Sequence, residues 1–174
     1  NIVATNIHFL HGVKQAQKNG AKVWLIDTYR TATAATVDET FLVRPGCDGV
    51  LALGLMHLLE RDGLLDHAFL DEHVQGFPEL KEQVLPDYPP QKVSELTGLP
   101  IATLEKMAIV FGQSQAPYIR LGSGLTRYGN GAMTARSIIA LPALVGAYGN
   151  PGGGCFADTS TGCYFDKATI HRED

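Results

Sequence analysis

The sequence predicts a three-layer α/β/α sandwich around a mainly parallel β-sheet. Two observations lead to this fold class. Short apolar segments alternate along the chain with amphipathic or apolar helical segments, which is the pattern of βαβ units. The segment Val23–Ile26 is continuously apolar, as expected for a parallel strand that helices cover on both faces. The length of 174 residues and the 45% hydrophobic content suit one globular domain with a full core.

The first predicted helix extends from about Asn6 to Asn19. Its apolar residues recur at helical spacing along one face, and its basic and amide residues occupy the other. The strand Val23–Ile26 follows directly. A helix that leads straight into such a strand is the second half of a βαβ unit, so we expect the first strand to lie upstream of Asn1. The chain is therefore expected to be an excised piece of a longer polypeptide.

The remaining elements continue this alternation. We expect strands at Phe41–Val43 and Pro117–Leu121, helices at Gly49–Arg61, Asp66–His73, Pro78–Val84 and Pro90–Leu96, a helix opened by Pro100, and a long helix from about Gly129 to Tyr148 that bends at Pro142. The glycine-rich stretch before Cys155 is expected to end the regular structure. These elements describe a Rossmann-like domain over residues 1–154 that lacks its first strand, followed by an irregular tail over residues 155–174.

Composition excludes several kinds of partner. The net charge is −4 and only 18% of residues are charged, so no electrostatic footprint for nucleic acid or anionic lipid is visible. No apolar run approaches the roughly 20 residues that span a bilayer, so no membrane insertion is expected. The three cysteines show no metal-ligand spacing. Their odd number favours a reducing, cytoplasmic compartment, and a periplasmic location stays open if the parent protein carries an export signal.

No motif for catalysis is present. The sequence contains no GxSxG nucleophile turn, no phosphate-binding loop that ends in Lys-Ser or Lys-Thr, and no complete GxGxxG fingerprint. We therefore expect no catalytic and no metal-ligating residue in this chain. The pattern indicates binding instead of reaction.

Asp27 is the first candidate binding residue. It ends the strand that begins at Val23, and α/β sheets bind ligands beyond the carboxyl ends of their strands. A carboxylate at this place can accept both hydroxyl hydrogens of a ribose, and Arg30 in the following loop offers donors for phosphate oxygens. The alternative is a turn aspartate that accepts hydrogen bonds from nearby backbone amides.

Asp48 is the second candidate, in the turn that also contains Gly46. An ionised carboxylate presents two acceptor oxygens, which match the adjacent N1–H and N2–H donors of guanine. Adenine lacks this pair of donors, so an aspartate here would select guanine. The alternative is simple capping of the helix that follows, worth about 1 kcal/mol. One oxygen can cap while the other reaches a base, so the two interpretations are compatible.

A turn of small residues follows the third predicted strand. Gly122, Ser123 and Gly124 would let backbone amides approach a ligand closely. A plain tight turn explains the same three residues equally well.

Taken together, these motifs resemble the molybdopterin oxidoreductase family of the dimethyl sulfoxide reductase type. The resemblance rests on GAKVWLIDTYRTATA (Gly20–Ala34), VRPGCDGVLALG (Val43–Gly54), the segments Leu65–Leu80 and Ser94–Ala108, RLGSGLTRYGNG (Arg120–Gly131) and LPALVGAYGNPGGG (Leu141–Gly154). It covers nearly the whole chain up to about Gly154.

The resemblance implies a cofactor and a place for this domain. Family members bind two molybdopterin guanine dinucleotides around molybdenum or tungsten, and this chain resembles the second-half α/β domain, which holds one of them. The family's two nucleotide-binding aspartates correspond to Asp27 and Asp48, which would contact the ribose–guanine end. Asn1 would lie near the pyrophosphate, and Gly122, Ser123 and Gly124 would face the pterin. Thr28 and Cys47 stand where the family commonly has Pro and Thr.

The resemblance also implies what surrounds this domain. The metal-ligating residue, and any iron–sulfur cluster, would lie upstream of Asn1. The cofactor performs oxygen-atom or electron transfer, so the isolated chain is not expected to be catalytic. The implied partners are the remaining domains of the same polypeptide, a small-molecule substrate and possible electron-transfer subunits. Two alternatives remain: a cofactor-free structural subunit with the same fold in an electron-transfer complex, and an NAD-linked dehydrogenase domain.

Overall fold

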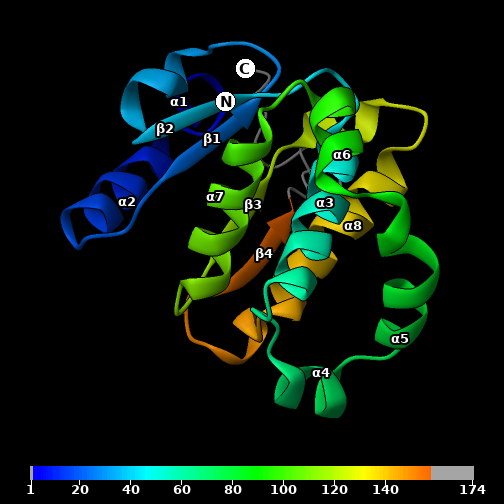
Figure 1. The fold of residues 1–174 in the computed structure, drawn as a ribbon. Helices are drawn as coiled ribbons and strands as arrows, with labels where there is room; N and C mark the ends of the chain where they lie inside the picture. Colours follow the sequence, from blue (N-terminus) through cyan, green and yellow to red (C-terminus); the bar gives the residue numbers. More distant parts are fainter. Residues whose placement is uncertain (1, 158–174) are drawn as a thin grey trace, which may run out of the picture.

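The computed structural model describes residues 2–157, and its strands form two parallel pairs (Figure 1). Strand β1 (Trp24–Asp27) pairs with β2 (Glu39–Leu42), so that Trp24 lies opposite Glu39. Strand β3 (Tyr118–Leu121) pairs with β4 (Gly154–Ala157). Among the described residues, β1 and β3 are not hydrogen-bonded to each other. The predicted α/β class with parallel strands is confirmed.

Helices connect the strands in the order that the sequence predicts. The α-helices are α1 (Ile2–Thr5), α2 (Ile7–Lys18), α3 (Asp48–Arg61), α4 (His67–His73), α5 (Phe77–Glu79), α6 (Pro90–Thr97), α7 (Ile101–Gln113) and α8 (Gly131–Leu144). A π-helical turn, η2 (Leu80–Val84), extends α5. The 3₁₀ turns are η1 (Ala32–Thr36), η3 (Leu85–Asp87), η4 (Ser123–Arg127) and η5 (Ala147–Gly149). None of the helices in this part of the chain has the length and apolarity that crossing a membrane would require.

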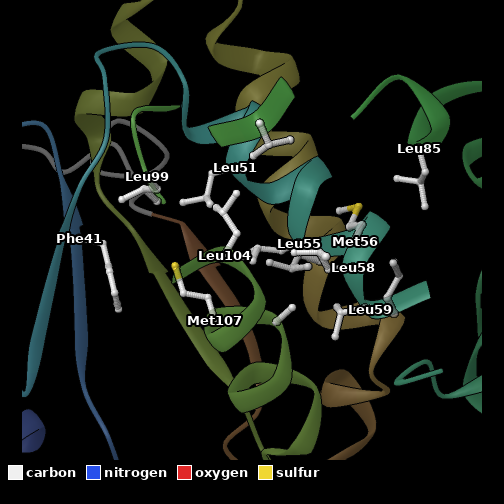
Figure 2. Close-up of a cluster of buried hydrophobic side chains, with 14 of the residues drawn as sticks. Phe41, Leu51, Leu55, Met56, Leu58, Leu59, Leu85, Leu99, Leu104 and Met107 are labelled. Carbon is white, nitrogen blue, oxygen red and sulfur yellow. The ribbon is translucent and has the colours of Figure 1, made fainter. Parts of the chain in front are cut away.

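Helix α3 lies at the centre of the core (Figure 2). Its Met56, Leu58 and Leu59 are completely buried, as its nearly all-apolar sequence predicts. Leu104 of α7 and Val93 of α6 pack into the same cluster and are also completely buried. The core is therefore built mainly by helices that gather around α3.

The two strand pairs share this core. Trp24 of β1 and Ile119 of β3 both pack against the cluster around α3, and Trp24 meets Phe41 of β2 edge-on, with ring centroids 5.3 Å apart. A smaller cluster joins Leu121 of β3 to Ala52 and Ile138 on the helices. The common core holds the pairs together although no ladder of hydrogen bonds links β1 to β3 in residues 2–157.

The expectation that the chain becomes irregular from Cys155 onward is wrong for Cys155–Ala157. These residues belong to β4, and the amide of Gly154 donates a hydrogen bond to the carbonyl of Pro117 at 2.9 Å. Gly152 and Gly154 adopt positive φ angles of 88° and 105°, which glycine permits, and they turn the chain back alongside β3. The rest of the predicted tail, residues 158–174, lies outside the described residues.

Other elements also differ from the prediction, among them the unpredicted short helix α1. The polar segment after β1 contains the 3₁₀ turn η1 instead of being wholly irregular. Strand β2 begins at Glu39, two residues before the predicted start. Helix α8 continues through Pro142 but ends at Leu144, and a turn at Gly146, with φ of 65°, separates it from η5. An interior proline removes one helical hydrogen bond, which is consistent with a helix end soon after it.

Candidate functional site

Asp27 lies at the carboxyl end of β1, as predicted, where the backbone leads into an exposed loop. One carboxylate oxygen, Oδ1, accepts a hydrogen bond from the amide of Thr28 at 2.8 Å. The backbone carbonyl of Asp27 accepts one from the amide of Val43 at 3.0 Å, which ties β1 to the end of β2. The turn interpretation therefore accounts for Oδ1, and no hydrogen bond from the described residues occupies the second oxygen.

Asp48 is the first residue of α3, and its carboxylate is half-buried. Burial raises the pKa of this carboxyl, a hydrogen bond from its own backbone amide opposes the rise, and the negative charge of Asp27 raises it further. The pairing of Asp27 with Leu42 and its backbone hydrogen bond with Val43 place Asp27 beside the start of the turn that leads to Asp48. Asp48 was expected to cap α3 as well as to reach a base. Instead, Cys47 occupies the N-cap position, and its side chain forms no capping hydrogen bond.

The turn before Asp48 is anchored to the end of α6. The amide of Arg44 donates to the carbonyl of Thr97 at 2.9 Å, and the thiol of Cys47 donates to the carbonyl of Leu96 at 3.4 Å. Gly46 has a φ of 81°, a left-handed conformation that favours glycine. These contacts give Asp48 a defined position at the start of α3.

The start of α3 packs against the start of α8. A Cβ atom on Gly49 would lie only 3.2 Å from both the Cα and the Oγ1 of Thr134, so the two helices approach closely at this point. This contact could not be predicted from the sequence, because a glycine within a helix does not indicate which residue packs against it. The contact brings the loop that precedes α8 toward the turn at Gly46.

The structure confirms an exposed small-residue turn at the end of β3. Leu121 is buried, whereas Gly122, Ser123 and Gly124 are exposed. A Cβ on Gly122 or Gly124 would meet no atom within 4 Å, so the turn is open to an approaching ligand. Among the described residues, no hydrogen bond joins these three residues to Asp27 or Asp48.

The turn at Gly122 leads to Tyr128, which does approach the aspartate turn. Ring atoms Cδ1 and Cε1 of Tyr128 lie 3.6 and 3.8 Å from the position of a Cβ on Gly46. Tyr128 thus connects the loop after β3 with the turn before Asp48. The sequence places Tyr128 shortly after the small-residue turn but does not indicate its contact with the turn at Gly46. That contact depends on how α8 packs on α3.

Two predicted residues are not brought into contact with this region. Arg30 is exposed and forms no hydrogen bond or ion pair with the described residues. Asn1 lies outside the described residues. Within residues 2–157, no group of three or more histidine, cysteine or carboxylate side chains is arranged to hold a metal ion.

A cavity of about 550 Å³ has Gly49 in its lining. Helices α3 and α8 form one wall, and the segment from Val74 to Tyr88 forms the other. Its lining is mostly apolar and includes neither Asp27 nor Asp48. The cavity and the paired carboxylates are therefore separate features.

The sequence model of the family described as molybdopterin oxidoreductase matches residues 2–169. A probable oxidoreductase, YoaE of Bacillus subtilis, is 36% identical over the whole chain, which spans 25% of that protein. A putative dimethyl sulfoxide reductase chain of Escherichia coli, YnfE, is 35% identical over 85% of the chain and 21% of its own length.

A solved structure is also similar. Acetylene hydratase from Pelobacter acetylenicus matches with a TM-score of 0.76 and 30% sequence identity, over 81% of this chain and 19% of that chain. The chain therefore spans about a quarter or less of the proteins that it resembles.

Proposed function

This chain belongs to the molybdopterin oxidoreductase family, and from that premise we propose that it holds the guanine nucleotide end of one molybdopterin guanine dinucleotide. One observation carries the proposal: Asp27 pairs with Leu42 and its carbonyl accepts from the amide of Val43, so the turn that leads to Asp48 starts beside Asp27, and the charge of Asp27 adds to the raised pKa of Asp48. Two acids placed together at the ends of neighbouring elements are costly in the free protein. A ligand with several N–H and O–H donors offsets that cost.

The residues present fit such a ligand. Asp48 would accept the N1–H and N2–H donors of guanine, because a carboxylate has two acceptor oxygens at suitable spacing. The second oxygen of Asp27 would accept from the ribose hydroxyls. The positive φ of Gly46 shapes the turn beside the base, Arg30 and Asn1 would serve the phosphates, and the open turn Gly122–Ser123–Gly124 would face the pterin.

The full protein would bind a second such dinucleotide and a molybdenum or tungsten ion, with an iron–sulfur cluster possible elsewhere in the polypeptide. When bound, the pterin-held metal supplies oxygen-atom or electron transfer. This chain would contribute binding and orientation of the nucleotide. It would act together with other domains of the same polypeptide and with electron-transfer subunits, on a small-molecule substrate.

The two strand pairs would form one sheet if a further strand joined them. Strands β1 and β3 belong to separate parallel pairs in residues 2–157, yet Trp24 and Ile119 pack against one core. A parallel strand between them would join the two pairs into one sheet, and a strand that leads into α1 has the required connection. The predicted first strand, upstream of Asn1, would occupy this place.

Calorimetric titration of the chain with GMP, GDP and ADP tests the proposal. We expect measurable binding of GMP and GDP and at least about tenfold weaker binding of ADP, since adenine lacks the paired donors and loses charge-assisted hydrogen bonds. Equal affinity for all three nucleotides, or binding of none, contradicts the guanine assignment.

A further inference from the structure

Tyr128 is an exposed aromatic residue beside the proposed guanine site. It directly follows η4 (Ser123–Arg127), and 41% of its surface is exposed. The ring atoms nearest to Gly46 are Cδ1 and Cε1, at 3.6 and 3.8 Å from the position of a Cβ on that glycine. These two atoms form one edge of the ring. A Cβ on Gly46 would therefore approach one side of the ring, and the exposed part of Tyr128 is available for another contact.

The ring of Tyr128 takes part in no polar, ring–ring or cation–π interaction among residues 2–157. No hydrogen bond, aromatic pair or cation–π contact involves it in this part of the chain. Other tyrosines are engaged: the hydroxyl of Tyr148 donates to the carbonyl of Ile139 at 2.7 Å, and the Nζ of Lys92 lies 5.7 Å from the ring centroid of Tyr88.

The ring of Tyr128 lies beside the site where a face of the bound base would otherwise be exposed to water. Asp48 would bind the hydrogen-bonding edge of guanine, but an edge contact leaves both faces of the purine exposed to water. Gly46 lies two residues before Asp48 and touches Tyr128. We propose that Tyr128 stacks on the guanine base held by Asp48 and so forms the aromatic wall of the site. This inference rests on the proposed function.

Another tyrosine is the main rival for this role. Tyr29 follows Asp27 by two residues and is 63% exposed, but a Cβ on Gly46 would have only Tyr128 among the described residues within 4 Å. It stands on the ribose side of the site, near the acid proposed to bind the sugar. Tyr128 is favoured because its ring touches the turn from which Asp48 projects.

The test measures binding of GMP and of ribose 5-phosphate by calorimetry, with Tyr128→Leu and Tyr128→Phe as the two variants. Stacking acts on the base alone and needs a ring but no hydroxyl. We expect Tyr128→Leu to weaken GMP binding by at least about fivefold, the lower end of measured base–aromatic stacking effects. Tyr128→Phe should stay within about twofold of the wild type, and ribose 5-phosphate should bind both variants and the wild type equally.

Tyr118→Leu and Tyr29→Leu are the controls. Tyr118 is 46% exposed but begins β3, at the opposite end of that strand from the site, so its replacement should leave GMP binding unchanged. If wild type binds GMP and Tyr128→Leu binds it equally well, or if Tyr29→Leu alone weakens binding, the assignment of Tyr128 is wrong and the guanine site stands. If wild type binds no GMP, the proposed function fails, and the stacking role fails with it. Far-ultraviolet circular dichroism checks that each variant is folded.

Discussion

The charge of Asp27, at the end of β1, raises the pKa of Asp48, at the start of α3. The two residues are separated by a polar segment, a 3₁₀ turn and a strand, and the fold brings their carboxylates together. Burial is the larger cause of the raised pKa, and the neighbouring charge adds to it. In the free protein this arrangement opposes ionisation of Asp48, so it favours a partner that donates hydrogen bonds to the carboxylate.

Replacing Asp48 with Asn should raise the stability of the fold and lower its affinity for GMP. The change removes a half-buried charge beside another carboxylate, so we expect a higher melting temperature at pH 7. It also replaces one acceptor oxygen with an NH₂ donor that faces a guanine donor, so GMP affinity should fall by about tenfold or more. Thermal unfolding and GMP titration of the same preparation measure both effects. A variant that is less stable and still binds GMP would show that Asp48 stabilises the start of α3 and does not bind the base.

The stability gained by Asp48→Asn should depend on pH in a predictable direction. The folded pKa of Asp48 lies above its ordinary value of 3.8, so in the folded state the carboxyl holds its proton more tightly than in the unfolded chain. The folded state is then favoured when Asp48 is protonated, and this contribution is lost as pH rises through the folded pKa. Urea unfolding of both proteins between pH 4.5 and pH 7.5 should show a difference that grows with pH. A constant difference would contradict the raised pKa.

Asp27→Asn should move the pH dependence of guanine binding. Only the ionised form of Asp48 accepts both guanine donors, so GMP affinity should decrease as pH falls through the pKa of Asp48. Removing the charge of Asp27 lowers that pKa, because a like charge no longer opposes ionisation. The midpoint of the pH profile should therefore shift to lower pH, even though the lost ribose contact weakens binding at every pH. An unshifted midpoint means that the two acids do not interact in solution.

The order of elements and the two acids could be predicted from sequence because each depends on local signals. Apolar runs and proline and glycine positions located α3, α6 and α7 within a few residues. The end of a buried strand and the start of a buried helix located Asp27 and Asp48. The roles of these residues, guanine binding by Asp48 and ribose binding by Asp27, come from the hydrogen-bonding capacity of a carboxylate and remain predictions.

Features that depend on packing could not be predicted in the same way. Strand β4 is short and begins with a glycine, and it is recognised as a strand by its pairing with β3 and by the packing of Cys155 and Ala157 on the smaller cluster. The contact of Tyr128 with Gly46 depends on the packing of α8 against α3 through Gly49. Neither relation has a periodicity or a spacing in the sequence, because each joins residues far apart in the chain.

A truncation in the core should destabilise the fold strongly. Leu104 of α7 is completely buried in the cluster around α3, so Leu104→Ala should lower the free energy of unfolding by about 2–5 kcal/mol. Ile109→Ala on the same helix provides the matched control, since Ile109 is 41% exposed and its truncation should cost much less. Urea unfolding monitored by circular dichroism compares the two. Similar losses would show that α7 does not present Leu104 to the core.

The close packing of α3 on α6 can be tested at Gly54. A Cβ at this position would lie 2.7 Å from both Cγ1 and Cγ2 of Val93, and Val93 is completely buried, so it cannot move aside freely. Gly54→Ala should therefore lower the free energy of unfolding by about 1–3 kcal/mol, despite the higher helix propensity of alanine.

A second substitution and a control make this prediction specific. Val93→Ala in the Gly54→Ala background removes the two methyl groups that clash, so the double variant should lose less stability than the sum of the single changes. Gly12→Ala in α2 is the control, because a Cβ there meets no atom within 4 Å, and it should raise stability by roughly 0.5–1 kcal/mol. Urea unfolding of the four variants supplies the comparison. Strictly additive losses at Gly54 and Val93 would mean that the two helices are not in contact at this point.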